Sequence, residues 1–189
     1  VFTGAVGSGT RVGAITINSA TDVTAAAVTA ASLVQSAGTG TTRLNGAVDT
    51  DAAAGVNIAA GTIVLNSTIT TANSGVVTLA AGAGGLTIAA AGDISADAAV
   101  SLTGAGTVKI STAGDVTTTG DDVTYNSDTT LTGNVSIGTG TGAGNISFSG
   151  KLDGTSAGNQ TLGLTAGTGN VVFTGAVGSG TRVGAITIN

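Results

Sequence analysis

Short stretches in which apolar and polar residues alternate recur along the whole chain. Alternation with a period of two is the pattern of a β-strand with one buried face. It predicts that Ile15 and Ile17 point inward with Thr16 pointing outward between them. Val108 and Ile110 are predicted to point inward in the same way. The chain therefore reads as a series of short strands separated by turns.

The strands follow a longer pattern, in which a large apolar residue ends a strand and is followed by a small residue and a turn. We interpret these apolar residues as anchors of successive structural units: Ile17, Leu44, Leu65, Ile88, Ile110, Leu131, Phe148 and Phe173. The spacing between them varies, and averages about 21 residues. The pattern predicts eight such units before the cycle restarts at Ile188.

The restart is marked by an exact duplication. The eighteen residues Val1–Asn18 and the eighteen residues Val172–Asn189 are identical, which sets a period of 171 residues. We therefore expect residues 1–171 to be one full tandem repeat and residues 172–189 to begin the next, with no separate domain or linker. We also expect the 189 residues to be a window on a longer array.

A period near 20 residues, built from short strands and Gly-rich turns, is typical of a β-solenoid. Each coil stacks its strands on the coils above and below, because one coil cannot bury its own apolar face. The sequence predicts an all-β chain folded as a parallel β-helix, with about eight coils of ~21 residues per 171-residue repeat. At ~4.8 Å per coil, one repeat would extend the solenoid by ~38 Å.

Small residues at the corners fit this stacking. Those that follow the anchors could form a hydrogen-bonded structural ladder from coil to coil, or could simply be residues that favour turns. The ladder candidates are Asn18, Asn45, Asn66, Ser111, Thr132, Ser149 and Thr174. We expect positive φ at the corner glycines Gly46, Gly92, Gly114, Gly133, Gly150 and Gly175.

The composition changes this picture only in its details. There are 33 Gly and no Pro, so each interior strand can donate to a ladder. With 41% hydrophobic but only 2% aromatic residues, the core must be narrow and filled by Val, Ile, Leu and Ala. We expect Phe148 and Phe173 to stack internally, with Phe2 repeating the role of Phe173.

Several longer stretches carry a family resemblance. The segments AGDVTTTGDDVTYNSDTTLTGNVSI, GTGNVVFTGAVGSGTRVGAITINSATDV and GLTIAAAGDIS resemble the repeat regions of giant bacterial surface proteins similar to filamentous haemagglutinin and β-strand-repeat adhesins. The resemblance covers essentially the whole chain. It implies a right-handed parallel β-helix that is exported and displayed as a fibre at the bacterial cell surface. It carries no binding residue over to this chain.

The chemistry that the sequence offers is sparse. The chain contains no His and no Cys, which removes the usual general base, thiol nucleophile and zinc ligands. We therefore expect no catalytic or cofactor-binding residues and no enzyme activity. The net charge of −5 argues against a nucleic-acid partner. No apolar run approaches the ~20 residues that span a bilayer.

Calcium is the one metal that the sequence leaves open. Asp121, Asp122 and Asp128 supply oxygen ligands close together in the chain, although calcium prefers six to eight oxygens and isolated Asp residues in turns usually bond local backbone. Ice binding would need a flat rank of outward threonines. Such a rank is broken by residues such as Ser101 and Val172.

These observations favour a structural role, in which the chain partners with itself end to end as a segment of an extracellular fibre, stalk or adhesin shaft. Lateral bundling of several rods is a further arrangement. The alternative function is a surface-binding adhesin module, whose exposed face recognises a glycan or a host surface. A calcium-stabilised or ice-binding solenoid is a weaker alternative.

Overall fold

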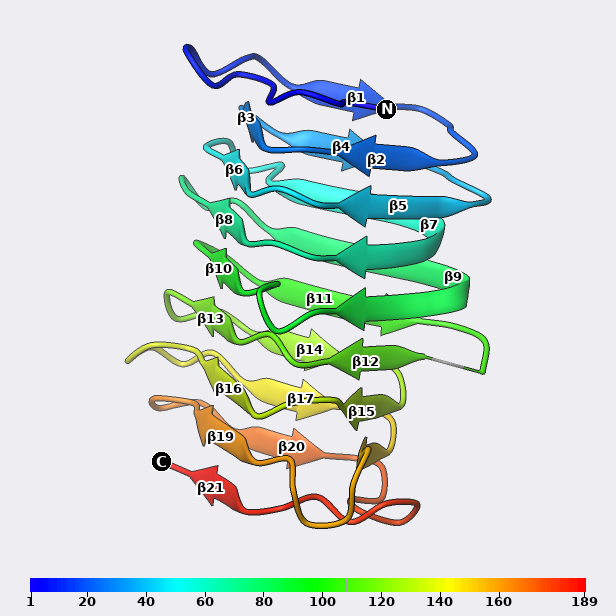
Figure 1. Cartoon of the computed structure of the whole chain (residues 1–189). Coiled ribbons are helices and arrows are strands. Elements are labelled where there is room, and N and C mark those ends of the chain that lie inside the picture. Colours follow the sequence, from blue (N-terminus) through cyan, green and yellow to red (C-terminus); the bar gives the residue numbers. More distant parts are fainter. Residues whose placement is uncertain (108) are drawn as a thin grey trace.

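The structure is a computed structural model that describes residues 1–107 and 109–189, and it is a three-sided β-solenoid (Figure 1). All regular elements in the described part are strands, and all strand pairs are parallel. The prediction of an all-β parallel β-helix is confirmed. The expectation for Val108 lies outside the described residues. The coils stack in chain order, with the N- and C-termini at opposite ends of the stack.

The strands form three faces, which we call A, B and C in the order in which the chain meets them from β1. Face A holds β1 (Ile15–Ile17), β4 (Leu33–Gln35), the first parts of β7 (Val56–Leu65) and β9 (Val77–Ile88), β11 (Val100–Gly104), β14 (Val123–Tyr125), β17 (Ile146–Phe148) and β20 (Val171–Phe173). Face B holds β2 (Val23–Ala25), β5 (Thr41–Leu44), the second parts of β7 and β9, β12 (Ile110–Thr112), β15 (Thr129–Leu131) and β18 (Leu152–Gly154). Face C holds β3 (Val28–Ala30), β6 (Val48–Thr50), β8 (Ile69–Thr71), β10 (Ile94–Ala96), β13 (Val116–Thr118), β16 (Val135–Gly138), β19 (Leu162–Thr165) and β21 (Ile186–Ile188).

The register between coils gives their length. Along face A, residue Ile15 pairs with Leu33, 18 positions later, and Ile146 pairs with Val171, 25 positions later. The coils between these two lie within that range. From β1 to β20 the chain makes seven turns, and β21 lies two faces further on. The 171-residue period therefore covers seven and two-thirds turns, close to the expected eight.

The anchor residues lie in the core, but on two faces. Leu44, Leu65 and Ile88 pair with one another on face B, and the next residue in that column is Thr112, with Leu131 after it. Ile110 lies two positions before this column, opposite Leu86. Ile17, Phe148 and Phe173 belong to face A instead. The irregular anchor spacing in the sequence therefore marks changes of face.

Burial of the anchors depends on their distance from the ends. Those inside the stack are almost fully buried: Leu44, Leu65, Ile88, Ile110, Leu131 and Phe148. Ile17 and Phe173 lie in the end coils and are only partly buried against the core. Stacking on both sides is thus what excludes water from an anchor.

The expectation of positive φ at the six corner glycines is wrong. None of them has a positive φ; such angles occur at other glycines, including Gly55 and Gly106. The six are instead places where coils approach closely. A Cβ on Gly46 would lie 2.4 Å from the Ala27 nitrogen, and one on Gly150 would lie 2.3 Å from the Asp128 nitrogen. These corners need glycine because of the neighbouring coil.

An aromatic stack fills one corner of the core near the C-terminal end. The rings of Tyr125 and Phe148 are 4.7 Å apart, and those of Phe148 and Phe173 are 5.3 Å apart, both nearly parallel. The internal stacking expected for the two phenylalanines is therefore present, and Tyr125 extends it. Burial raises the pKa of the Tyr125 hydroxyl well above its ordinary value.

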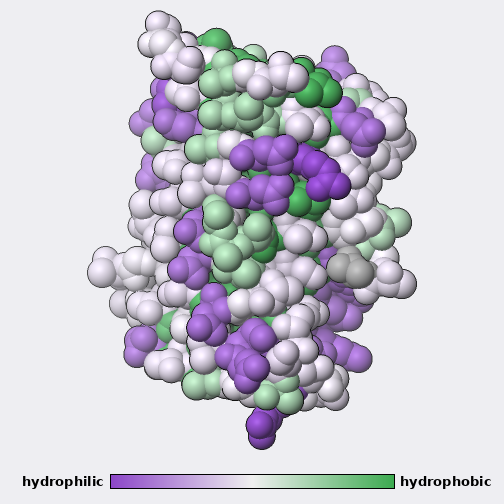
Figure 2. Space-filling view, viewed as in Figure 1, coloured by the Kyte–Doolittle hydropathy of each residue, from purple (hydrophilic) through white to green (hydrophobic). Residues whose placement is uncertain are grey.

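The side of the molecule seen in Figure 2 is mostly of intermediate hydropathy, with small scattered groups of hydrophilic and of hydrophobic residues. This follows from the outward Thr, Ser, Asn and Gly of the alternating strands. Within the part of the chain that the structure describes, no helix has the length and apolar character needed to cross a membrane.

Candidate functional site at the two ends of the solenoid

Exposed large apolar side chains are concentrated in the two identical end segments. We call Val1–Asn18 the first copy and Val172–Asn189 the second copy. In the described structure, the exposed large hydrophobic residues all belong to these copies: Val1, Val12, Val172, Val177 and Ile188. Soluble proteins usually leave such side chains scattered singly over the surface, so their restriction to the two end segments makes the ends the candidate site.

Equivalent positions in the two copies are exposed to different degrees. Val12 of the first copy is 36% exposed, whereas Val183 at the same place in the second copy is 6% exposed. The opposite holds for the last isoleucine, because Ile188 is 57% exposed and Ile17 is partly buried. A preceding coil covers the valine and a following coil covers the isoleucine. Each copy is therefore covered by a neighbouring coil on one side and exposed to solvent on the other.

The first copy bonds to the coil that follows it. Phe2, Val6 and Val12 each direct both the N–H and the carbonyl toward that coil, as in a parallel ladder. The donated bonds are Phe2 N–H to the Thr24 carbonyl (2.7 Å), Val6 to Ala27 (2.9 Å), Val12 to Thr29 (3.2 Å) and Ile15 to Ser32 (2.9 Å). The carbonyls of Phe2, Val6, Val12, Gly13 and Ile17 accept bonds from the same coil.

The second copy bonds to the coil that precedes it, through other backbone groups of the same sequence. The donated bonds are Thr174 N–H to the Phe148 carbonyl (2.9 Å), Gly178 to Leu152 (2.7 Å), Gly184 to Gln160 (2.7 Å) and Asn189 to Leu164 (2.9 Å). The carbonyls of Ala176, Thr181, Arg182 and Ala185 accept bonds from that coil. In addition, the Asp153 carboxylate accepts bonds from the N–H groups of Gly180 and Thr181.

These two sets of backbone groups do not overlap. Phe2 uses its N–H and carbonyl toward the following coil, while Thr174, which matches Thr3, uses its N–H toward the preceding coil. The other bonded groups given above are divided in the same way; at one matched position the Gly13 carbonyl bonds to the following coil and the Gly184 N–H bonds to the preceding coil. One eighteen-residue segment can therefore make both sets of bonds at once. The segment thus has two bonding edges, one for the preceding coil and one for the following coil.

The side chain of Arg11 reinforces the edge of the first copy. Its guanidinium lies 3.1 Å from an Asp49 carboxylate oxygen and 3.0 Å from an Asp51 carboxylate oxygen. It also donates to the carbonyls of Ala30 (2.7 Å) and Asp49 (2.9 Å). Arg182, at the same place in the second copy, makes no ion pair with a residue that the structure describes. Ala30 lies in the coil that follows the arginine, and Asp49 and Asp51 lie in the coil after that. The clamp therefore depends on the two coils that follow Arg11.

Matched positions of the two copies lie on different faces, which corrects the expectation that Phe2 repeats the place of Phe173. Phe2 pairs with Ala25 on face B, whereas Phe173 pairs with Phe148 on face A. The sequence does not show this difference, because two identical segments give no signal of the face that each position joins.

Only part of the predicted corner ladder is present. Asn66 donates to the side-chain oxygen of Asn45 at 2.8 Å, and the ladder ends there because Ala89 follows in the next coil. Ser111 lies in the middle of β12 rather than at a corner. Among the described residues, no side-chain bond joins Asn18, Thr132, Ser149 or Thr174 into this ladder. A second rung, which the sequence reasoning missed, joins Asn126 to Ser101 and Thr103.

A more regular set of corner bonds also escaped the sequence reasoning. An Asp or Asn side chain just before a strand accepts the N–H of the matching residue one coil further on. Examples are Asp22 to Thr41, Asp93 to Asp115, Asp115 to Ser136, Asp122 to Asn145, Asp128 to Lys151 and Asn145 to Asn170. The signal was visible in the sequence as an Asp or Asn immediately before the first residue of a strand, usually a β-branched one.

Two of the three calcium candidates, Asp122 and Asp128, take part in this corner system. Asp122 accepts both the backbone and side-chain N–H of Asn145. Asp128 pairs with the Lys109 ammonium at 2.9 Å, and bonds from Lys151 and Lys109 hold the pKa of its carboxyl below the ordinary value. Asp121 bonds through its backbone to the Thr118 side chain. No group of three or more His, Cys, Asp or Glu residues in the described chain could hold a metal ion.

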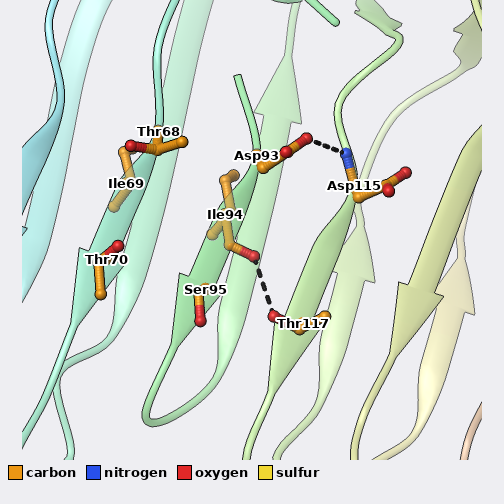
Figure 3. A pocket seen from close by; sticks show the side chains of 8 residues that line it. All are labelled: Thr68, Ile69, Thr70, Asp93, Ile94, Ser95, Asp115 and Thr117. Atoms are coloured by element: carbon orange, nitrogen blue, oxygen red, sulfur yellow. Dashed lines mark hydrogen bonds between the residues drawn. The ribbon is translucent and has the colours of Figure 1, made fainter. Parts of the chain in front are cut away.

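One depression of about 230 Å³ lies on the outside of face C (Figure 3). It is lined by residues of three strands and the corners before them: Thr68, Ile69, Thr70, Asp93, Ile94, Ser95, Asp115 and Thr117. Several polar groups here bond to one another, since Asp93 accepts the Asp115 N–H and Thr117 donates to the Ile94 carbonyl. The volume is below the ~300–1,000 Å³ usual for small-molecule sites.

Comparison with known proteins finds no matching family model, no matching curated protein and no matching solved structure. The resemblance to bacterial surface-protein repeats therefore rests on the sequence segments that carry it.

Proposed function

We propose that this chain is a structural segment of a long extracellular bacterial fibre, stalk or adhesin shaft, built by end-to-end continuation of the 171-residue repeat. The observation that supports this most directly is the pair of end copies, whose backbone groups divide without overlap between a preceding and a following coil. A segment that serves as both the first and the last coil is suited to joining one repeat to the next.

The open ends agree with this role. An uncovered solenoid end exposes unpaired strand groups and apolar side chains, which favour association. In the proposed array, the next repeat covers Ile188 and supplies the partners for Arg182, just as the two following coils do for Ile17 and Arg11. The continuous ladders give the fibre stiffness, and the outward Thr, Ser and Asn residues keep it soluble.

The test is to compare chains of one, two and four repeats by electron microscopy. The proposal predicts rods whose length increases by about 37 Å per added repeat, from seven and two-thirds coils at ~4.8 Å each. Separate globular beads, or a length that does not increase in this way, would contradict it. Labelling of intact and lysed producing cells with antibody to the purified chain tests the surface location.

A further inference from the structure

Matched residues of the first and second copies lie on different faces of the solenoid. Phe2 lies on face B, and Val6 pairs with Val28 on face C. At the same places in the second copy, Phe173 lies on face A and Val177 pairs with Leu152 on face B.

The isoleucine strands at the ends of the two copies differ in the same way. Ile15–Ile17 forms β1 on face A, and Ile186–Ile188 forms β21 on face C. Each matched position of the second copy therefore lies one face earlier than in the first copy. Because the shift is the same at three separated places, it belongs to the whole coil.

We propose that successive repeats share one such coil and that each repeat is rotated by one face, about a third of a turn, relative to the repeat before it. This inference rests on the proposed array. Superposing the first copy of a following repeat on the second copy of this one makes the new face B continue the old face A. New face C then continues old face B, and new face A continues old face C.

The hydrogen bonds allow this joint without rearrangement. The shared coil bonds to the preceding repeat through groups such as the Thr174 and Gly178 N–H. It bonds to the following repeat through groups equivalent to the Phe2 and Val6 N–H. A joint without rotation would shift the strand pairing of the shared segment with one of the two repeats. The backbone hydrogen bonds to that repeat would then be lost.

The rotation determines how the fibre presents its surface. A feature confined to one face of a single repeat, such as the depression on face C, would appear on all three sides of the fibre in turn. The fourth repeat would bring it back above the first. Such a fibre has no single side on which identical features line up, so it presents the same contacts all around its axis.

The experiment uses a chain of four repeats with one cysteine in each, because the natural sequence contains none. Thr70→Cys places it on the exposed centre of β8 on face C. Asn57→Cys, exposed on face A in β7, is the matched second position. Each chain is labelled with a maleimide-linked protein tag and imaged by cryo-electron microscopy.

We expect the tags to step around the rod by one face per repeat, with the fourth tag above the first, for both cysteine positions. Tags in one straight line along a continuous rod would overturn the rotation while leaving the array intact. Rods that break into separate units at the junctions would overturn the array itself, and the rotation with it. The two failures are therefore distinguishable.

Discussion

At the residue scale, small polar side chains form hydrogen bonds with backbone groups at the corners between strands. Inward threonines at the end of face C strands show this well. The Thr71, Thr118 and Thr139 hydroxyls donate to carbonyls three to five residues later in the chain. Buried hydroxyls need such partners, because leaving one unsatisfied costs about 1–3 kcal/mol.

Thr50 offers a direct test, since it pairs in register with Thr71 but its buried hydroxyl has no hydrogen-bond partner in the described structure. We predict that Thr50→Val raises the free energy of unfolding by about 1 kcal/mol, because an apolar methyl replaces an unsatisfied hydroxyl. Thr71→Val is the matched variant and should lower the free energy by a similar amount. Urea denaturation of both proteins measures the difference, and shifts in the same direction would contradict this account.

Arg11 and Arg182 form a second matched pair, identical in sequence context but different in partners. Arg11→Ala should release the first copy and speed amide exchange at Phe2 and Val6, through the loss of two ion pairs and two carbonyl bonds. Because the carboxylates are substantially exposed, screening limits the ion-pair contribution to ~1 kcal/mol or less. Arg182→Ala should leave exchange unchanged in the 189-residue chain. Equal effects of the two substitutions would contradict the role of the clamp.

At the element scale, each coil is held by backbone ladders and by side chains that reach the next coil. Asp128 is one of these, since it accepts the Lys151 N–H at 2.9 Å and pairs with Lys109. These contacts favour the ionised form, so the pKa of the carboxyl is lower in the folded chain than in the unfolded chain.

The sign of the resulting pH dependence follows from linkage. The stabilising contribution of Asp128 is fully present above the unfolded pKa of about 3.9 and is lost as the pH falls through the lower folded pKa. We predict that the Asp128→Asn variant loses less of its free energy of unfolding than the natural chain as the pH falls from ~5 to ~2. Urea midpoints over this range provide the measurement. Parallel pH profiles for the two proteins would refute the prediction.

The close approach between coils can be tested at Gly4 and Gly175, which occupy the same position in the two copies. A Cβ on Gly4 meets nothing within 4 Å, whereas one on Gly175 would lie 2.2 Å from the Gly150 carbonyl oxygen. We expect Gly175→Ala to displace the last coil, at a cost of about 1–3 kcal/mol, and Gly4→Ala to be tolerated. Amide exchange at Thr174 and Gly178 reports the displacement, and undisturbed protection in Gly175→Ala would argue against the close packing.

The sequence predicts which residues of a strand point inward, but it does not predict the face of the solenoid to which each strand belongs. Alternation placed Ile15 and Ile17 inward with Thr16 outward, because a period of two follows directly from strand geometry. The face of each strand depends on how many residues each corner consumes, and corners of Gly, Ala and Ser carry no distinctive signal. For this reason the anchor pattern does not separate Phe148 from Leu131, although they lie on different faces.

At the scale of the whole molecule, the solenoid is a nearly one-dimensional object, in which each coil contacts its neighbours and the ends are the exception. The end coils are the least buried, and they hold the exposed large apolar residues of the described structure. The same eighteen residues occupy both ends, with complementary edges open. The account therefore centres on one claim, that a single copy of this segment bonds on both edges when repeats are joined.

Amide hydrogen exchange on a two-repeat chain tests that claim most directly, with isotope labels confined to the eighteen residues at the junction. The account predicts slow exchange at both sets of amides in this one copy: those of Phe173, Val177 and Ile186 toward the following repeat, and those of Thr174, Gly178 and Gly184 toward the preceding one. Fast exchange of either set, with the other set protected, would show that the junction coil bonds on one edge alone and would contradict the account.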